Sequence, residues 1–232
     1  MKEAKKLLAC MLKNVLLLAL FVTLALASTN ATEAAACTLG TATGCSTSVC
    51  SGLTAQLVQE LNAMGYTFTN IASSGYSSYI HCTSPCEPYL QAAAATSLRT
   101  AAQSKNDYIT LNSAYRSSAQ QYLLYQWYLQ GKCNIGLAAV PGSSDHEAGR
   151  SIDTSYYSYW MSTLTSNGWT WSYGNSDPYH FDYFASPDIS TQSLKAFQNL
   201  WNIHNPNDKI TADGIYGPAT ASALSRAPCN GW

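Results

Sequence analysis

The sequence predicts an α+β fold, in which helices pack on a small and mostly antiparallel sheet. Two observations support this class. Apolar residues at helical spacing dominate the part of the chain before residue 105, and short aromatic or β-branched segments dominate the part from residue 150 to 184. Helices followed by strands are typical of α+β domains, whereas α/β domains alternate the two.

The first 27 residues have the pattern of a secretory signal peptide. A basic start precedes an apolar run, and Ala25-Leu26-Ala27 ends it with the small residues of a signal-peptidase site. We expect cleavage after Ala27 and a secreted, extracellular protein, which would be periplasmic in a Gram-negative bacterium. An uncleaved N-terminal anchor is the alternative, and Lys13 argues against it because it interrupts the apolar run.

The composition of the expected mature chain narrows the choice of partners. Removing 27 of the 232 residues leaves 205, with 8 basic and 12 acidic residues and a formal charge of −4. No basic stripe is present, so nucleic acid and anionic membranes are poor candidates. Charged residues are few and tyrosines number 16, which favours carbohydrate or peptide contacts. We expect a monomer that does not bind membranes once the signal is removed.

Seven cysteines remain beyond the signal, and in an exported chain they indicate disulfides. They are Cys37, Cys45, Cys50, Cys82, Cys86, Cys133 and Cys229. Because seven is odd, one is free or pairs between chains. We interpret Cys82 and Cys86 as a disulfide, since no second Cys/His pair of matching spacing would complete a metal knuckle. The connectivity of the others stays open.

Helical spacing and turn residues predict the elements in order. After a cysteine-containing lead-in over 28–51, helices are expected over 53–64, 88–104, 118–131 and 159–165. Pro88 suits the first turn of the second helix, and Ser117 is a candidate cap for the third. Strands are expected over 107–116, 150–154, 170–173 and 179–184. We assign these elements to one domain, 52–186.

The tail over 187–232 is expected to form a separate small helical unit. Leu194, Phe197 and Trp201 share one helical face, and Gly217-Pro218 opens a last helix. About 40 residues are too few for a stable core without help. The tail should therefore dock on the first domain or be tied to it by Cys229.

Two histidines and an aspartate form a candidate metal site. His146 and Asp153 lie seven positions apart around Gly149, and His180 follows in an aromatic strand. Two imidazoles and one carboxylate are a common ligand set for catalytic zinc. Asp177 lies three residues before His180 and could serve as the base, while Arg116 offers a planar fork for a substrate carboxylate. Glu147 is the rival base; His81 and His204 lack such neighbours and are interpreted as non-ligands.

These residues resemble the zinc D-alanyl-D-alanine carboxypeptidases of the VanY type. The resemblance runs from about Leu111 to Tyr183 and rests on the following motifs: Ser113-Ala114-Tyr115-Arg116-Ser117, Pro141-Gly142-Ser143-Ser144, Ser144-x-His146-x6-Asp153, Asn167-Gly168-Trp169 and Asp177-Pro178-Tyr179-His180. It implies zinc on His146, Asp153 and His180, with Asp177 as base. It also implies substrate contacts from Arg116, Ser144 and Gln121, and a fold similar to the hedgehog signalling domain.

Three positions depart from the VanY pattern. Asp177 and Tyr179 stand where such members usually carry Glu and Trp, and the bulky Arg150 follows Gly149. Aspartate is one methylene shorter, so the backbone must bring it to the water. The tail resembles the second half of a peptidoglycan-binding repeat, in segments around Phe197 and 211–220.

The resemblance implies a secreted zinc peptidase that hydrolyses peptidoglycan stem peptides and releases the terminal D-Ala. An endopeptidase of the same family, cutting within the stem or crosslink, is a close alternative. A non-catalytic zinc-containing module that binds the wall or signals is a second alternative. The sequence leaves open the host, and with it whether the wall is its own or foreign.

Overall fold

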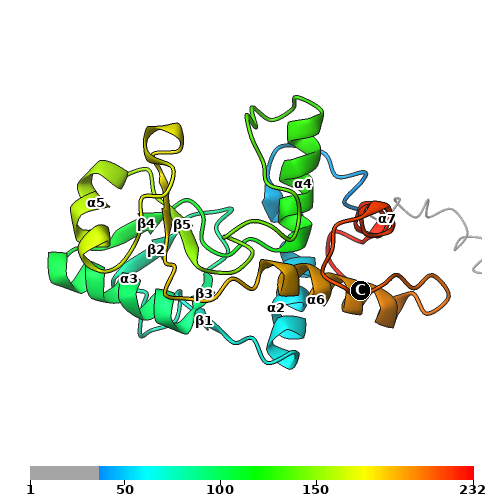
Figure 1. The fold of residues 1–232 in the computed structure, drawn as a ribbon, viewed down its shortest axis with the longest axis horizontal. Helices are drawn as coiled ribbons and strands as arrows, with labels where there is room; N and C mark the ends of the chain where they lie inside the picture. The colour runs from blue at the N-terminus through cyan, green and yellow to red at the C-terminus, as the bar shows by residue number, and fades with distance from the viewer. Residues whose placement is uncertain (1–36) are drawn as a thin grey trace, which may run out of the picture. The chain divides into compact units, whose positions relative to one another are not determined.

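The computed structural model describes residues 37–232 (Figure 1). The expected signal peptide and the first part of the lead-in lie outside these residues. Between positions 37 and 232, no helix combines the length and the apolar character that crossing a membrane requires. The elements follow in the order η1 (Thr47–Cys50), α2 (Ser51–Ala63), β1 (Phe68–Asn70), β2 (Ile80–Cys82), β3 (Tyr89–Gln91), α3 (Ala92–Lys105), β4 (Ile109–Leu111), α4 (Ser118–Leu129), β5 (Ser151–Asp153), α5 (Tyr157–Ser166), η2 (Gly174–Ser176), β6 (His180–Asp182), α6 (Ser190–His204) and α7 (Pro218–Arg226).

The α+β class is confirmed, and the strands are arranged as three separate pairs. β1 pairs with β3 and β5 with β6, both antiparallel, whereas β2 pairs with β4 in parallel. Isolated bridges, such as Ser113 to Asp153 and Thr170 to Asp182, connect neighbouring segments. The expected strand over 170–173 is reduced to the single bridge at Thr170.

The second expected helix begins four residues later than predicted. Tyr89–Gln91 forms β3 opposite β1, so the helix starts at Ala92 instead of Pro88. Pairing with a distant segment outweighs the local preference of Pro88 for a first helical turn. The strand around residue 110 is also shorter than expected, because only Ile109–Leu111 forms a continuous ladder, with β2, while Ser113 and Tyr115 form isolated bridges.

The expected cap of the third helix is confirmed. The Ser117 hydroxyl accepts a hydrogen bond from the Gln120 amide at 3.2 Å, and the Gln120 side chain accepts one from the Ser117 amide at 3.0 Å. This reciprocal arrangement is a capping box, which satisfies two amides that would otherwise lack partners. The Ser117 hydroxyl also lies 2.8 Å from that of Thr54 in α2, so the cap joins two helices.

Two main hydrophobic clusters organise the described residues. One lies among α3, α5 and the strands and contains Trp160, Phe181 and Ile109. The other joins residues of α2, α4, α6, α7 and the lead-in, including Leu39. The apolar face of the tail contributes to the second cluster, since Leu194, Phe197 and Trp201 are all buried there. The tail thus docks as expected, while a domain boundary at residue 187 stays a prediction.

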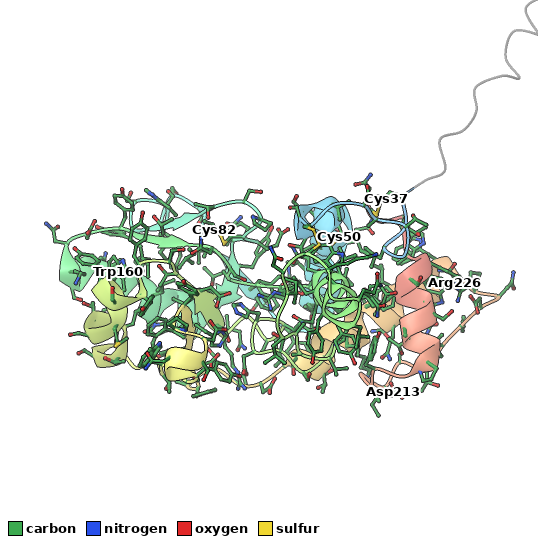
Figure 2. The ribbon with its side chains drawn as sticks, turned by 90° about the horizontal axis from the view of Figure 1, so that it is seen from above. Cys37, Cys50, Cys82, Trp160, Asp213 and Arg226 are labelled. Carbon is green, nitrogen blue, oxygen red and sulfur yellow. A yellow bond between two sulfur atoms is a disulfide. The ribbon has the colours of Figure 1, made fainter. Side chains whose placement is uncertain are left out.

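Three disulfides are present between positions 37 and 232 (Figure 2). The short loop closes through Cys82 and Cys86, as expected. The other bonds pair Cys37 with Cys229 and Cys45 with Cys133. The first ties the tail to the lead-in, and the second ties the lead-in to the segment after α4. Cys50 is the odd cysteine of this region; it is unpaired and buried.

Candidate metal centre and active site

The three candidate metal ligands meet in the folded chain. One ligand atom from each of His146, Asp153 and His180 lies within 4.8 Å of the others. His146 Nε2 is 3.2 Å from His180 Nδ1 and 3.3 Å from Asp153 Oδ1, and His180 Nδ1 is 3.1 Å from the same oxygen. Asp153 and His180 are direct partners in the β5–β6 pair. This group of three could hold a metal ion.

The turn at Gly149 brings His146 to the strand pair. Gly149 has a φ of +65°, a conformation that side chains disfavour. A Cβ there would also meet the Phe68 ring at 2.2 Å, so the site needs glycine on both counts. The His146 carbonyl accepts hydrogen bonds from the amides of Gly149 at 3.0 Å and Arg116 at 3.1 Å. These bonds fix the backbone that carries the imidazole.

Each histidine also has a partner on the side away from the cluster. His146 Nδ1 lies 2.7 Å from the Ala114 carbonyl, so this nitrogen carries the proton and Nε2 is free to ligate. His180 Nε2 lies 2.8 Å from Asp182 Oδ1, which leaves Nδ1 directed at the cluster. Such outer partners orient metal-binding imidazoles and raise their basicity.

Asp182 is a functional residue that the sequence analysis missed. Its carboxylate is buried and accepts hydrogen bonds from the hydroxyls of Ser151 and Ser172 as well as from His180. The sequence contained evidence for this pairing of Asp182 with His180, because residues two apart in a strand point to the same face. An acid two positions after a histidine in a predicted strand is therefore a candidate partner for that histidine.

The electrostatics of the cluster favour a positive charge at its centre. Burial lowers the pKa of His146. Burial also disfavours charge on His180, but hydrogen bonds with Asp153 and Asp182 outweigh it and raise the pKa of His180 to about 9. Asp153 is likewise desolvated, yet the neighbouring histidines hold its pKa well below the ordinary value. A cation bound between these groups would satisfy the same carboxylates.

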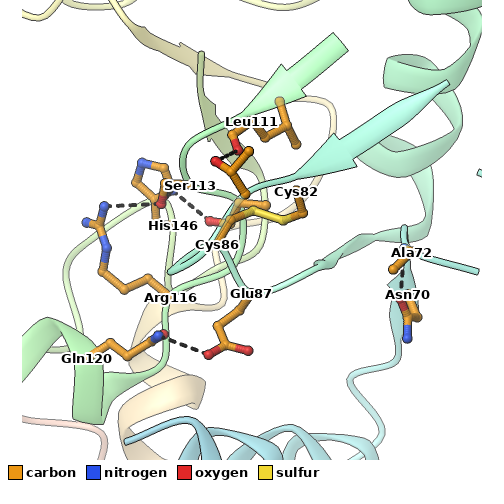
Figure 3. The surroundings of a disulfide bond; sticks show 12 residues. Asn70, Ala72, Cys82, Cys86, Glu87, Leu111, Ser113, Arg116, Gln120 and His146 are labelled. Carbon is orange, nitrogen blue, oxygen red and sulfur yellow. Dashed lines mark hydrogen bonds between the residues drawn. A yellow bond between two sulfur atoms is a disulfide. The ribbon is translucent and has the colours of Figure 1, made fainter. Parts of the chain in front are cut away.

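Arg116 lies beside the cluster, where two neutral side chains and the Asp153 carboxylate orient it. Its Nη1 donates to Gln121 Oε1 at 3.1 Å. Its Nη2 donates to the Ser113 hydroxyl at 3.3 Å (Figure 3). The guanidinium is 3.7 Å from Asp153 Oδ2 and keeps part of its surface exposed. Gln121 is anchored in turn by donating to the Ala139 carbonyl at 2.7 Å. The arginine can therefore meet a further anion.

One pocket of about 380 Å³ contains every site residue predicted from the sequence. Its lining includes Arg116, Gln121, Ser144, His146, Asp153, Asp177 and His180. Asp177 is exposed at this pocket, and the turn before β6 carries it. Tyr173 also lines the pocket, with its ring 5.0 Å from that of His180, and was interpreted in the sequence only as part of a strand.

Glu147, the rival base, points away from this pocket. It is fully buried, and both of its carboxylate oxygens accept from the Gly142 amide at 2.9 Å. One oxygen also accepts from the Ser144 amide at 3.2 Å. Burial raises the pKa of Glu147 to about 8. Its contacts hold the loop before His146 and give it no access to a substrate.

The two remaining histidines lie away from the cluster. The His81 ring stacks on Tyr108 at 4.4 Å between centroids, and the His204 ring stacks on Trp232 at 4.9 Å. Neither is part of the group that could hold a metal ion.

Comparison with known proteins gives first a class and then a family. A His–Asp–His cluster beside an arginine in one pocket is an arrangement that metal-dependent hydrolases use. Residues 88–183 match the family model VanY, described as D-alanyl-D-alanine carboxypeptidase. This match confirms the resemblance over that segment. The match does not extend to the tail, whose repeat resemblance stays a prediction. A search of curated proteins found no match.

Proposed function

We propose that this protein is a secreted, zinc-dependent D-alanyl-D-alanine carboxypeptidase that acts on peptidoglycan stem peptides. One observation carries the proposal. Within the segment that matches VanY, His146, Asp153 and His180 bring three ligand atoms within 4.8 Å of one another, in the pocket that Arg116 lines. This arrangement supports a hydrolytic centre next to a group that would bind a carboxylate.

The donor set fits zinc. Two imidazole nitrogens and one carboxylate oxygen leave an open position in a tetrahedral site. The outward nitrogens of His146 and His180 already have acceptors, so the inward lone pairs are available. When bound, zinc supplies a Lewis acid for the scissile carbonyl and lowers the pKa of a water molecule toward 7.

Arg116 is proposed to hold the substrate's terminal carboxylate. A guanidinium presents two parallel N–H groups to a carboxylate, and its charge does not depend on pH in the physiological range. Gln121 and Ser113 orient the guanidinium by accepting hydrogen bonds from it. This contact would select a free C-terminus, because a peptide that continues past the site has no carboxylate to offer.

Asp177 is proposed to move the proton. Its carboxylate would accept a proton from the attacking water and return it to the leaving amine. In this hydrolysis the terminal C–N bond breaks, the hydroxyl joins the carbonyl carbon and the proton goes to the amine nitrogen. The exposure of Asp177 at the pocket supports this role, since the group must reach both water and substrate.

Secretion and the peptidoglycan partner belong to the same proposal. Three disulfides suit an oxidising compartment, where such bonds persist. A peptidase of the VanY family would meet stem peptides there. We propose that the protein acts as a monomer.

The experiment is digestion of a stem pentapeptide ending in D-Ala-D-Ala, followed by mass spectrometry. The proposal expects loss of a single D-Ala, inhibition by a chelator and recovery with zinc. Cleavage inside the stem would show that the protein is an endopeptidase and not a carboxypeptidase. If the peptide stays intact although each chain binds one zinc, the protein is a non-catalytic module.

A further inference from the structure

A second hollow adjoins the metal pocket. It has a volume of about 230 Å³ and shares four lining residues with the metal pocket: Arg116, Leu124, Ile135 and Asp153. Asn112, Ser113 and Gln120 also line it, together with the apolar side chain of Trp127. A ligand group in this hollow would therefore contact the guanidinium that faces the metal cluster.

Part of its wall comes from outside the segment that matches VanY. Cys45 and Thr47 belong to the lead-in, and Pro85 belongs to the loop closed by the Cys82–Cys86 disulfide. The family match begins only at residue 88. These side chains thus lie outside the matched segment and line the same hollow as Arg116.

The lead-in is held firmly on the side away from the pocket. The Leu39 amide donates to the Ala227 carbonyl at 2.9 Å, and the Gly40 amide donates to the Ser225 carbonyl at 2.8 Å. The Cys37–Cys229 disulfide closes the same contact. The tail therefore supports the lead-in, which continues to the short helix η1 and the buried Thr47.

The second disulfide restrains the wall that the two hollows share. Cys45 bonds to Cys133, immediately before the segment 134–140, which has no regular secondary structure. Ile135 in this segment lines both hollows. Farther along, the segment is anchored where Gln121 donates to the Ala139 carbonyl. The wall beside Arg116 is thus fixed at one end by the disulfide and at the other by the residue that orients the arginine.

We propose that the lead-in forms a subsite for the residue released by hydrolysis, and that the Cys45–Cys133 disulfide and Thr47 restrict this subsite to one small residue. The proposal rests on the proposed function and adds a structural reason for release of single residues. A hollow of about 230 Å³ is smaller than the roughly 300–1,000 Å³ of ordinary ligand pockets. It suits one side chain and a carboxylate paired with Arg116.

The test measures binding, so that its result does not depend on turnover. Two phosphinate analogues of the stem peptide serve as probes with the zinc-loaded protein. One ends a single residue after the phosphinate, and the other continues for three more residues. Isothermal titration gives the ratio of the two dissociation constants for the parent and for each variant. Metal content and Tm confirm that the variants are folded.

In the double variant Cys45→Ser/Cys133→Ser, the preference for the short probe should fall about tenfold, because the wall without its disulfide can move and accommodate the longer probe. The matched control is Cys37→Ser/Cys229→Ser, which removes a disulfide outside the hollow. The backbone hydrogen bonds of Leu39 and Gly40 still hold the lead-in in this variant, so it should keep the preference. An unchanged ratio in the first variant would overturn the proposal. An equal loss in both variants would also overturn it, since general loosening would then explain the effect.

A milder variant tests Thr47 directly. Thr47→Ala enlarges the hollow, so a short probe with a leucine-sized last residue should gain about tenfold in affinity relative to one ending in alanine. No change in this relative affinity would contradict the role of Thr47. Absence of peptide hydrolysis by the parent would count against the proposed function alone, because the binding ratios would still decide the subsite.

Discussion

His180 donates from Nε2 to the buried carboxylate of Asp182 over 2.8 Å, along one face of strand β6. The other ring nitrogen is thereby left facing Asp153. A carboxylate that orients a metal-binding imidazole commonly contributes 10–100-fold to metal affinity. The position of Asp182 therefore extends the site beyond the three candidate ligands.

Asp182→Asn should weaken zinc binding by about 10–100-fold, because the amide is a poorer acceptor for the imidazole proton. Competition with a fluorescent chelator measures this affinity. Asp208→Asn, which alters an exposed carboxylate paired with Arg226, is the matched control and should leave zinc affinity unchanged. Equal affinities for the parent and Asp182→Asn would show that Asp182 plays no part in the site.

Asp177→Asn should retain one zinc per chain and lose about 10²–10⁴-fold in kcat, because the amide cannot accept the proton from water. Metal analysis and release of D-Ala from the pentapeptide measure the two quantities. Asn175→Ala changes an exposed neighbour in the same turn and should keep turnover. Full turnover by Asp177→Asn would remove this residue from the mechanism.

Arg116→Lys should raise KM for a peptide with a free C-terminus by roughly tenfold to a hundredfold, as expected for loss of a hydrogen bond to a charged group. The same peptide with a C-terminal amide should respond much less, because it has no carboxylate to lose contact with. Steady-state kinetics on both peptides checks this. The role of Arg116 is refuted by equal effects on the two substrates.

Glu87→Gln should change how stability depends on pH. Burial raises the pKa of Glu87 above its ordinary value of 4.5, while hydrogen bonds from Ser51 and Gln120 oppose that rise. A raised folded-state pKa stabilises the protein below about pH 4.5, and this effect is lost as pH rises through the folded-state pKa. The Tm of the variant relative to the parent should therefore be higher at pH 7 than at pH 4. A constant Tm difference would contradict this.

Leu224→Ala should reduce the free energy of unfolding by about 2–5 kcal/mol, because the side chain is fully buried in the cluster shared by the tail and α2. Urea titration followed by circular dichroism measures the change. Ile215→Ala, at a position in the tail that is 65% exposed, should stay within about 0.5 kcal/mol of the parent. A loss below about 1 kcal/mol for Leu224→Ala would mean that the tail contributes little to the core.

The parts of the site that the sequence predicted are those with local signatures. The ligand spacing around Gly149, the capping residue Ser117 and the Asp177–His180 cluster can be recognised from residue type and separation alone. The structure brings all of these ligands and substrate-binding candidates into one pocket.

The features that the sequence did not predict depend on contacts between distant segments. Strands β1 and β2 have three residues each, too few for a periodic pattern to be recognised, so only their partners β3 and β4 define them. The pairing of Cys45 with Cys133 requires the path of the lead-in. Asp182 is an exception, because its position two residues after His180 in an expected strand was visible in the sequence, and the structure adds the hydrogen bond between the two side chains.

Anomalous diffraction at the zinc absorption edge tests the central claim most directly. Crystals of the zinc-loaded protein should show one strong peak within about 2.0–2.2 Å of His146 Nε2, His180 Nδ1 and an Asp153 oxygen. A protein saturated with zinc that shows no peak among these three side chains, or binds the ion elsewhere, would contradict the account.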